Sequence, residues 1–159
     1  MNRLTPLAIR IGALPWLPRY IRQVVATDRF LRAASGDRVT LLRIAGLPSL
    51  WLTTTGRRSG HRRTTPLLCV PHQGSYLVAG SNWGAPTLPA WVLNLRAHPE
   101  ATVSVLRRRV PVRAREVEGQ ERAELWEVML RTWPNYAKYA ERTAREIPVF
   151  VLEPTTSPH

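Results

Sequence analysis

Cysteine is nearly absent from this chain of 159 residues, in which Cys69 stands alone. An intramolecular disulfide is therefore excluded, and a reducing, cytoplasmic compartment is expected. The histidines are scattered and, with one cysteine, offer no zinc-ligand spacing; they are His61, His72, His98 and His159. The sequence therefore predicts no metal site.

The familiar motifs of catalytic sites are missing as well. Neither the dinucleotide-binding pattern GxGxxG nor the phosphate loop GxxxxGK[ST] occurs. Ser59 has no nucleophile elbow around it. The 11 acidic residues gather mostly in the late helical segments, so no carboxylate pair for hydrolysis stands out. If the chain is an enzyme, a bound cofactor supplies the demanding chemistry.

Lysine is almost absent too, because Lys138 is the only lysine among 23 basic residues, and the net charge is +12. The planar guanidinium of arginine pairs bidentately with phosphate or carboxylate, so this bias indicates an acidic ligand. Nucleic acid and an anionic membrane surface would suit the same charge.

The N-terminal segment, residues 1–38, predicts helix rather than a membrane span. Its apolar run at residues 4–17 is too short to cross a bilayer, is interrupted by Arg10 and Pro15, and is followed by no signal-peptidase site. Residues 18–34 predict an amphipathic helix with arginines between its apolar positions. We favour packing of this helix against the domain, and peripheral contact with the inner membrane face is the alternative.

From residue 39 to residue 154 the pattern changes to short strands separated by turns. We predict strands at residues 39–44, 49–55, 63–70, 75–81, 101–106, 110–116 and 147–152, and helices at residues 89–97, 121–133 and 135–145. This order is not βαβ alternation. It favours an α+β fold, a mostly antiparallel barrel or closed sheet with appended helices. Residues 155–159 are expected to form a disordered tail.

Residues 52–70 are the most unusual stretch. They predict two strands joined by a turn that carries Arg57, Arg58, Arg62 and Arg63 and is bracketed by two glycines able to adopt positive φ, Gly56 and Gly60. Backbone amides and guanidinium groups in such a turn form an anion site. From residue types alone, an anionic small ligand and a solvated loop are equally supported, with nucleic acid behind both.

Several segments, taken in this order, resemble the deazaflavin-dependent nitroreductase family. They are residues 52–60 with 63–67, residues 80–84, residues 89–96 with His98-Pro99, and residues 147–150. The resemblance covers about residues 39–154. It implies a split β-barrel of six to seven strands that binds reduced coenzyme F420, a deazaflavin, and passes its hydride to a quinone, a nitroaromatic or a similar acceptor.

That coenzyme ends in a phosphate and an oligoglutamate tail. The resemblance assigns the tail to five residues of the turn: Arg57, Arg58, Ser59, Gly60 and Arg63. It implies that the deazaflavin ring is bordered by Pro66, Ala79, Ser81, Asn82, Trp91 and Asn94. For Trp91, an ordinary position in the core is an equal alternative.

The resemblance also places Tyr136 and Tyr139 toward the acceptor, with packing against the barrel as the alternative. An acceptor that gains a hydride gains negative charge, which hydroxyl donors such as Ser81 or Tyr136 would stabilise. The predicted catalytic residues are therefore Ser81, Tyr136 and Tyr139, and no dedicated base is required.

Some positions depart from the common family pattern. Arg58 stands where lysine is frequent, and Arg62 replaces a frequent proline. Asn82 and Trp83 stand where some members have lysine and glycine, beside the acceptor, so we favour quinone reduction over nitroreduction. The alternative functions are a non-catalytic split-barrel protein that binds flavin or haem, and a basic nucleic-acid-binding module. A monomer or homodimer is expected.

Overall fold

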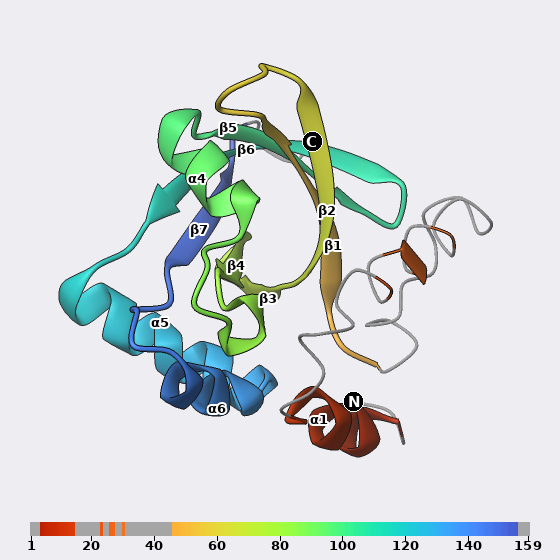
Figure 1. Cartoon of the computed structure of the whole chain (residues 1–159). Helices are drawn as coiled ribbons and strands as arrows, with labels where there is room; N and C mark the ends of the chain where they lie inside the picture. The colour runs from red at the N-terminus through yellow and green to blue at the C-terminus, as the bar shows by residue number, and fades with distance from the viewer. Residues whose placement is uncertain (1–3, 15–22, 24–25, 28–29, 31–45, 156–159) are drawn as a thin grey trace.

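Seven antiparallel strands form one curled sheet (Figure 1). The computed structural model describes residues 4–14, 23, 26–27, 30 and 46–155. The strands run in the order β2-β1-β5-β6-β7-β4-β3, and every neighbouring pair is antiparallel. They are β1 (Ser49–Thr55), β2 (Arg62–Leu68), β3 (Val70–His72), β4 (Ser75–Ala79), β5 (Glu100–Val105), β6 (Arg108–Glu116) and β7 (Val149–Pro154).

Within these described residues, four α-helices and one 3-10 turn are appended to the sheet. They are α1 (Thr5–Gly12), η2 (Asn82–Gly84), α4 (Ala90–Ala97), α5 (Gly119–Thr132) and α6 (Asn135–Arg142). α4 and α5 confirm the predicted helices to within a residue or two. α6 ends at Arg142, three residues before the predicted end. α1 lies within the N-terminal segment for which helix was predicted, but no separate helix was placed at its residues; the proline at its start suits a first helical turn.

The hairpin between β5 and β6 turns earlier than the sequence predicted. Val105 pairs with Arg108, so the turn consists of Leu106 and Arg107, whose φ angles are 50° and 67°. Two-residue turns with positive φ at both positions match the twist of antiparallel strands. The expected turn at residues 107–109 is therefore wrong, and Arg108 and Arg109 begin β6.

Alternating side chains give the sheet a buried layer on each face. On one face, Leu52 of β1 packs with Val92 of α4. On the other, Leu77 of β4 packs with Met129 of α5 and Tyr139 of α6. Full burial of one such aliphatic side chain contributes about 1.5–3 kcal/mol. The two layers fix α4 on one side of the sheet and α5 and α6 on the other.

α1 lies beside α6 (Figure 1). Asn135 Nδ2 donates a hydrogen bond to the Ile9 carbonyl at 2.5 Å, and Arg142 donates to the Ala13 carbonyl. Most of the helix predicted at residues 18–34 lies outside the described residues. Within that range only residues 23, 26, 27 and 30 are described, and all four are helical. The strand predicted at residues 39–44 lies outside the described residues entirely. Of the tail predicted at residues 155–159, only Thr155 is described, and it is ordered, because its N–H donates to the Pro111 carbonyl at 3.0 Å. None of the helices described has both the length and the apolar character that a bilayer crossing requires.

Candidate functional site

The arginine turn between β1 and β2 is closed by its own backbone. The Gly56 N–H donates to the His61 carbonyl at 2.8 Å, and the Gly60 N–H donates to the Gly56 carbonyl at 2.8 Å. The positive φ predicted for a glycine is found at Gly60, at 72°. Gly56 is needed for space instead, because a Cβ there would lie 2.8 Å from Ser59 Oγ. That oxygen accepts a hydrogen bond from the His61 N–H at 3.1 Å.

Asn94 of α4 fastens this turn to the sheet. Its Oδ1 accepts from the Arg57 backbone N–H at 3.0 Å, and its Nδ2 donates to Thr54 Oγ1 at 3.2 Å. Asn94 is 4% exposed and Thr54 is 1% exposed, so neither polar group has water as a ready substitute partner. Thr54 is also the register partner of Arg63, and cross-strand partners share one face of a sheet. Arg57 and Arg63 are thereby gathered on the α4 side.

The guanidinium groups of the turn are exposed and have no compensating partner in the described part of the chain. Arg57, Arg58 and Arg63 make no ion pair and no side-chain hydrogen bond with any residue described. Arginines elsewhere do pair with carboxylates, for example Arg96 with Glu116 at 2.7 Å. An ordered loop with three permanently charged guanidinium groups that have no partner among the described residues suits a ligand with several carboxylates or phosphates.

The predicted ligand residues of β2 lie on opposite faces of the sheet. Arg63 faces the α4 side, and Pro66, three residues further along the strand, faces the other side. Ala79, at the end of β4, is also on that other side, packed against the layer under α5 and α6. Arg62 shares the face of Pro66, where its Nη2 donates to Thr102 Oγ1 at 3.1 Å.

The loop that follows β4 carries Ser81 and Asn82. Asn82 has a φ of 43°, and its Nδ2 donates to the Thr87 carbonyl at 3.0 Å, which closes the loop on itself. Ser81 is partly buried, and its hydroxyl has no hydrogen bond to a described residue. Gly84 has a φ of 80°, and a Cβ there would lie 2.9 Å from the Tyr139 carbonyl oxygen. The loop therefore lies directly against α6.

α4 connects the loop and the arginine turn. A Cβ on Gly80 would lie 2.7 Å from Val92 Cγ2, and the same helix holds the turn through Asn94. With eight residues, α4 is only about 12 Å long. The turn and the loop are therefore close enough to contact one extended small molecule. Trp91 is 7% exposed and packs edge-on against Phe150, so it occupies the core position that was the alternative.

Tyr136 and Tyr139 are buried, at 4% and 2% exposure. Their rings meet edge-to-face with centroids 6.2 Å apart, and the Tyr139 hydroxyl accepts a hydrogen bond from Trp133 Nε1 at 3.3 Å. Burial raises the pKa of Tyr139 to about 12 and also raises the pKa of Tyr136, so both phenols are neutral at physiological pH. The packing alternative is what the structure contains, and contact with an acceptor stays a prediction.

Arg145 was missed by the sequence interpretation. Its guanidinium donates to the carbonyls of Gly80, Ser81 and Ala85 at 3.0, 3.0 and 3.1 Å. These acceptors lie 60 to 65 residues earlier in the chain. Thr54, the partner of Asn94, was missed as well. Neither a contact of a side chain with distant main-chain carbonyls nor a single contact between two distant side chains leaves a spacing signal in a sequence.

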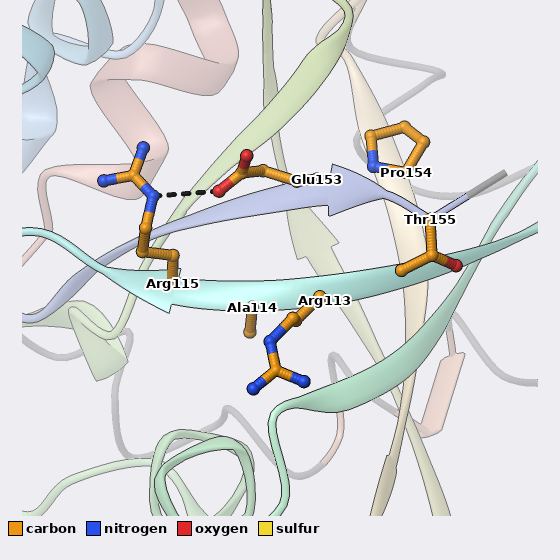
Figure 2. Close-up of a pocket in the computed structure, with 6 residues that line it drawn as sticks. All are labelled: Arg113, Ala114, Arg115, Glu153, Pro154 and Thr155. Carbon is orange, nitrogen blue, oxygen red and sulfur yellow. Dashed lines mark hydrogen bonds and ion pairs between the residues drawn. The ribbon is translucent and has the colours of Figure 1, made fainter. Parts of the chain in front are cut away.

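The rest of the described surface offers weaker candidates. A shallow pocket of about 460 Å³ lies on β6 and β7, lined by Arg113, Ala114, Arg115, Glu153, Pro154 and Thr155 (Figure 2). Figure 2 shows Arg115 directed at Glu153, with 2.8 Å between Nε and Oε1. Both arginines of the pocket are paired with carboxylates. No cluster of three histidine, cysteine or acidic residues suited to a metal occurs among the residues described.

The curled antiparallel sheet with helices on both faces defines the split β-barrel class, and solved structures agree. A reductase described as F420-H2 dependent, FDR-A, is similar with a TM-score of 0.62 and 39% identity, covering 67% of this chain and 94% of that one. Another, described as a domain-swapped dimer, has a TM-score of 0.65 and 36% identity, covering 85% of this chain and 98% of that one.

Residues 21–154 match the F420H(2)-dependent quinone reductase family. The F420H(2)-dependent quinone reductase of Mycobacterium tuberculosis (strain H37Rv) is 39% identical over 142 residues, which are 86% of this chain and 95% of that protein. The chain therefore belongs to the F420H(2)-dependent quinone reductase family. Membership makes it a deazaflavin-dependent oxidoreductase with reduced coenzyme F420 as hydride donor. The predicted family, fold class and cofactor are confirmed.

Proposed function

We propose that this chain reduces a quinone and binds the acidic tail of coenzyme F420 at the arginine turn. The observation that carries the proposal is the group of three exposed guanidiniums, Arg57, Arg58 and Arg63, with no partner among the described residues. Their charge and planar donor geometry fit an oligoglutamate chain and a phosphate. Ser59 contributes its hydroxyl to the same tail, and Gly60, whose N–H donates to the Gly56 carbonyl at 2.8 Å, contributes by shaping the turn.

In this proposal the coenzyme extends from its acidic tail at the arginine turn, past α4, to its ring at the loop after β4. Ser81 and Asn82 border the ring, while Trp91 and Asn94 support it from α4. Pro66 and Ala79, which the resemblance also assigns to the ring, lie on the face of the sheet opposite α4 and so do not line this path. The bonds that Asn82 and Asn94 make within the protein give both residues a further task, which is to hold the backbone of the loop and of the turn.

The coenzyme, when bound, supplies the hydride, and the protein supplies position and charge. A quinone that receives a hydride becomes a hydroquinone anion, whose oxygen needs a hydrogen-bond donor. We assign that donor to the Ser81 hydroxyl, which is engaged by no described residue. Tyr136 and Tyr139, being neutral phenols, would act only as donors, and only after their packing opens.

The proposal is tested with the purified full-length protein. We expect a saturable fluorescence change on titration with F420, followed by oxidation of F420H2 when menadione is added. Nitroimidazole acceptors are expected to give a lower kcat/KM than menadione. Folded protein that fails to bind F420 would contradict the coenzyme assignment. A higher kcat/KM for the nitroimidazole would contradict the choice of acceptor.

We further propose that α1 contacts the membrane surface peripherally. Leu4, Leu7 and Ile11 are 47%, 54% and 43% exposed, and their spacing places them on one helical face. Arg10 is exposed on the same helix, and the whole chain carries a net charge of +12. An apolar strip with a cation beside it fits an anionic lipid surface, where quinones with apolar tails dissolve.

Co-sedimentation with lipid vesicles checks this contact. The protein is expected to sediment with phosphatidylglycerol vesicles more than with phosphatidylcholine vesicles. A variant with Leu7→Ser and Ile11→Ser is expected to lose most of that binding while keeping its turnover with menadione in solution. Equal sedimentation of the variant and the wild type would remove α1 from this role.

A further inference from the structure

Arg145 binds four main-chain carbonyls of a single loop. It lies in the segment between α6 and β7, and its Nη1 donates to the Gly80 carbonyl at 3.0 Å. Its Nη2 donates to Ser81 at 3.0 Å and to Thr87 at 3.3 Å, and its Nε donates to Ala85 at 3.1 Å. The acceptors come from both limbs of the loop at residues 80–87, so one side chain joins the start of the loop to its end.

Within the loop, Asn82 Nδ2 donates to the Thr87 carbonyl at 3.0 Å and so also links the two limbs. Among the described residues, however, no hydrogen bond of the loop itself reaches the carbonyls of Gly80 or Ala85. The Gly84 N–H donates to the Ser81 carbonyl at 2.8 Å, and the Ala85 N–H donates to the Asn82 carbonyl at 2.9 Å. The carbonyls that Arg145 binds have no strand ladder to supply donors. The planar guanidinium group has five N–H donors and can bind acceptors in several directions at once. The compact ammonium group of lysine has three donors and cannot make the same set of bonds.

α6 supports the loop from a second side. A Cβ on Gly84 would lie 2.9 Å from both the Arg142 Cβ and the Tyr139 carbonyl oxygen, so the loop backbone touches the last turns of this helix. Arg145 follows the end of α6 by three residues. The helix and the guanidinium therefore enclose the loop between them.

Arg145 forms no ion pair with any of the residues described. The adjacent carboxylate, Glu146, pairs instead with Arg122, at 2.8 Å. The side-chain hydrogen bonds of Arg145 to described residues all go to carbonyl oxygens of the loop, while its backbone N–H donates to Thr143 Oγ1 at 3.3 Å. Burial lowers the pKa of Arg145, but a guanidinium keeps its proton. A partly buried cation is thus held in place by loop carbonyls alone.

We propose that Arg145 is a positioning residue that holds the loop at residues 80–87, and with it Ser81 and Asn82, in the geometry that hydride transfer requires. This inference rests on the proposed function, which places those two residues beside the ring. Arg145 itself touches neither coenzyme nor acceptor. Because the arginine turn binds the tail independently, loss of Arg145 should affect turnover more than coenzyme affinity.

The test compares Arg145→Lys with Arg122→Lys in the full-length protein. Arg122 is a matched control, since its Nη2 also donates to a main-chain carbonyl, that of Ile147, at 2.7 Å, and it has no bond to the loop among the described contacts. In Arg145→Lys we expect kcat with menadione to fall about tenfold or more and the Kd for F420 to change less than about threefold. Hydrogen exchange of the amides at residues 81–87 should quicken about tenfold, with β1 unchanged.

The outcomes separate the inference from the proposed function. Loop exchange and kcat in Arg145→Lys that match those in Arg122→Lys would overturn the positioning role. Should the lysine variant fail to fold, Arg145→Gln replaces it, with the same quickening of loop exchange expected. Wild-type protein that does not bind F420 would defeat the proposed function, while the exchange measurement would still decide whether Arg145 orders the loop.

Discussion

Replacing Arg57 and Arg63 together with alanine is expected to raise the Kd for coenzyme F420 by at least about 10²-fold, because each charge-assisted hydrogen bond contributes about 1.5–3 kcal/mol. Both side chains are exposed and have no partner in the described part of the chain, so little folding energy is lost with them. Fluorescence titration measures the Kd, and thermal unfolding measures stability. The Tm should stay within about 2 °C of the wild-type value.

A variant with Arg108→Ala and Arg109→Ala is the matched control. These two arginines are also exposed and lie at the start of β6, so the variant loses the same two charges away from the turn. The control should bind F420 with nearly wild-type affinity at physiological salt, because distant exposed charges are screened. Equal losses of affinity in the two double variants would show that net charge, rather than the turn, attracts the coenzyme.

Most strands were predictable because each is short, apolar on at least one face and bounded by turn residues. The short β3 (Val70–His72) was missed, because residues 63–70 were predicted as a single strand. β1 and its hairpin with β2 follow from the aromatic and β-branched side chains at residues 51–55 and from the two glycines of the turn. The end of α6 was predicted less well. Its helical pattern extends to Arg145, but the chain leaves the helix at Arg142 so that Arg145 can bind the loop. A tertiary contact overrides local propensity there.

The candidate site was predictable only in part. The arginine turn is local in sequence, so its composition predicted an anion site before any fold was known. Tyr136 and Tyr139 share a helical face whether they line a site or pack in a core, and spacing does not separate those cases. Arg145 acts on carbonyls that every residue carries, so no residue type marks its partners. Only the folded structure, and no pattern in the sequence, brings Arg145 to those carbonyls.

Asn94 shows how the structure changes the meaning of a predicted residue. The family resemblance places it near the coenzyme. In the structure its amide is used at both ends by the protein, by the Arg57 N–H and by the Thr54 hydroxyl. Asn94 can therefore act on the coenzyme through Arg57, by fixing the backbone from which that guanidinium extends. If Asn94 binds the coenzyme directly, a change at its buried partner Thr54 should leave the affinity for F420 unchanged. If Asn94 positions the arginine turn, the same change should weaken that affinity.

Asn94→Ala is expected to lower the free energy of unfolding by about 2–4 kcal/mol, because the Arg57 N–H and the Thr54 hydroxyl lose their shared partner in a buried site. The Kd for F420 should rise about tenfold, as the turn loses its anchor to α4. Urea unfolding and fluorescence titration measure the two effects. Because both interpretations of Asn94 predict weaker binding here, a second variant must discriminate between them.

Thr54→Val provides that discrimination. Thr54 is 1% exposed and touches no ligand, yet its hydroxyl orients Asn94, so the variant should weaken F420 binding several-fold if Asn94 positions the turn. Thr53→Val is the matched control, since the neighbouring hydroxyl lies on the opposite face and bonds to Thr64 at 2.8 Å. Thr54→Val with wild-type affinity would show that Asn94 binds the coenzyme directly. Affinity lost in Thr54→Val but kept in Thr53→Val would place the effect in the contact between β1, α4 and the arginine turn.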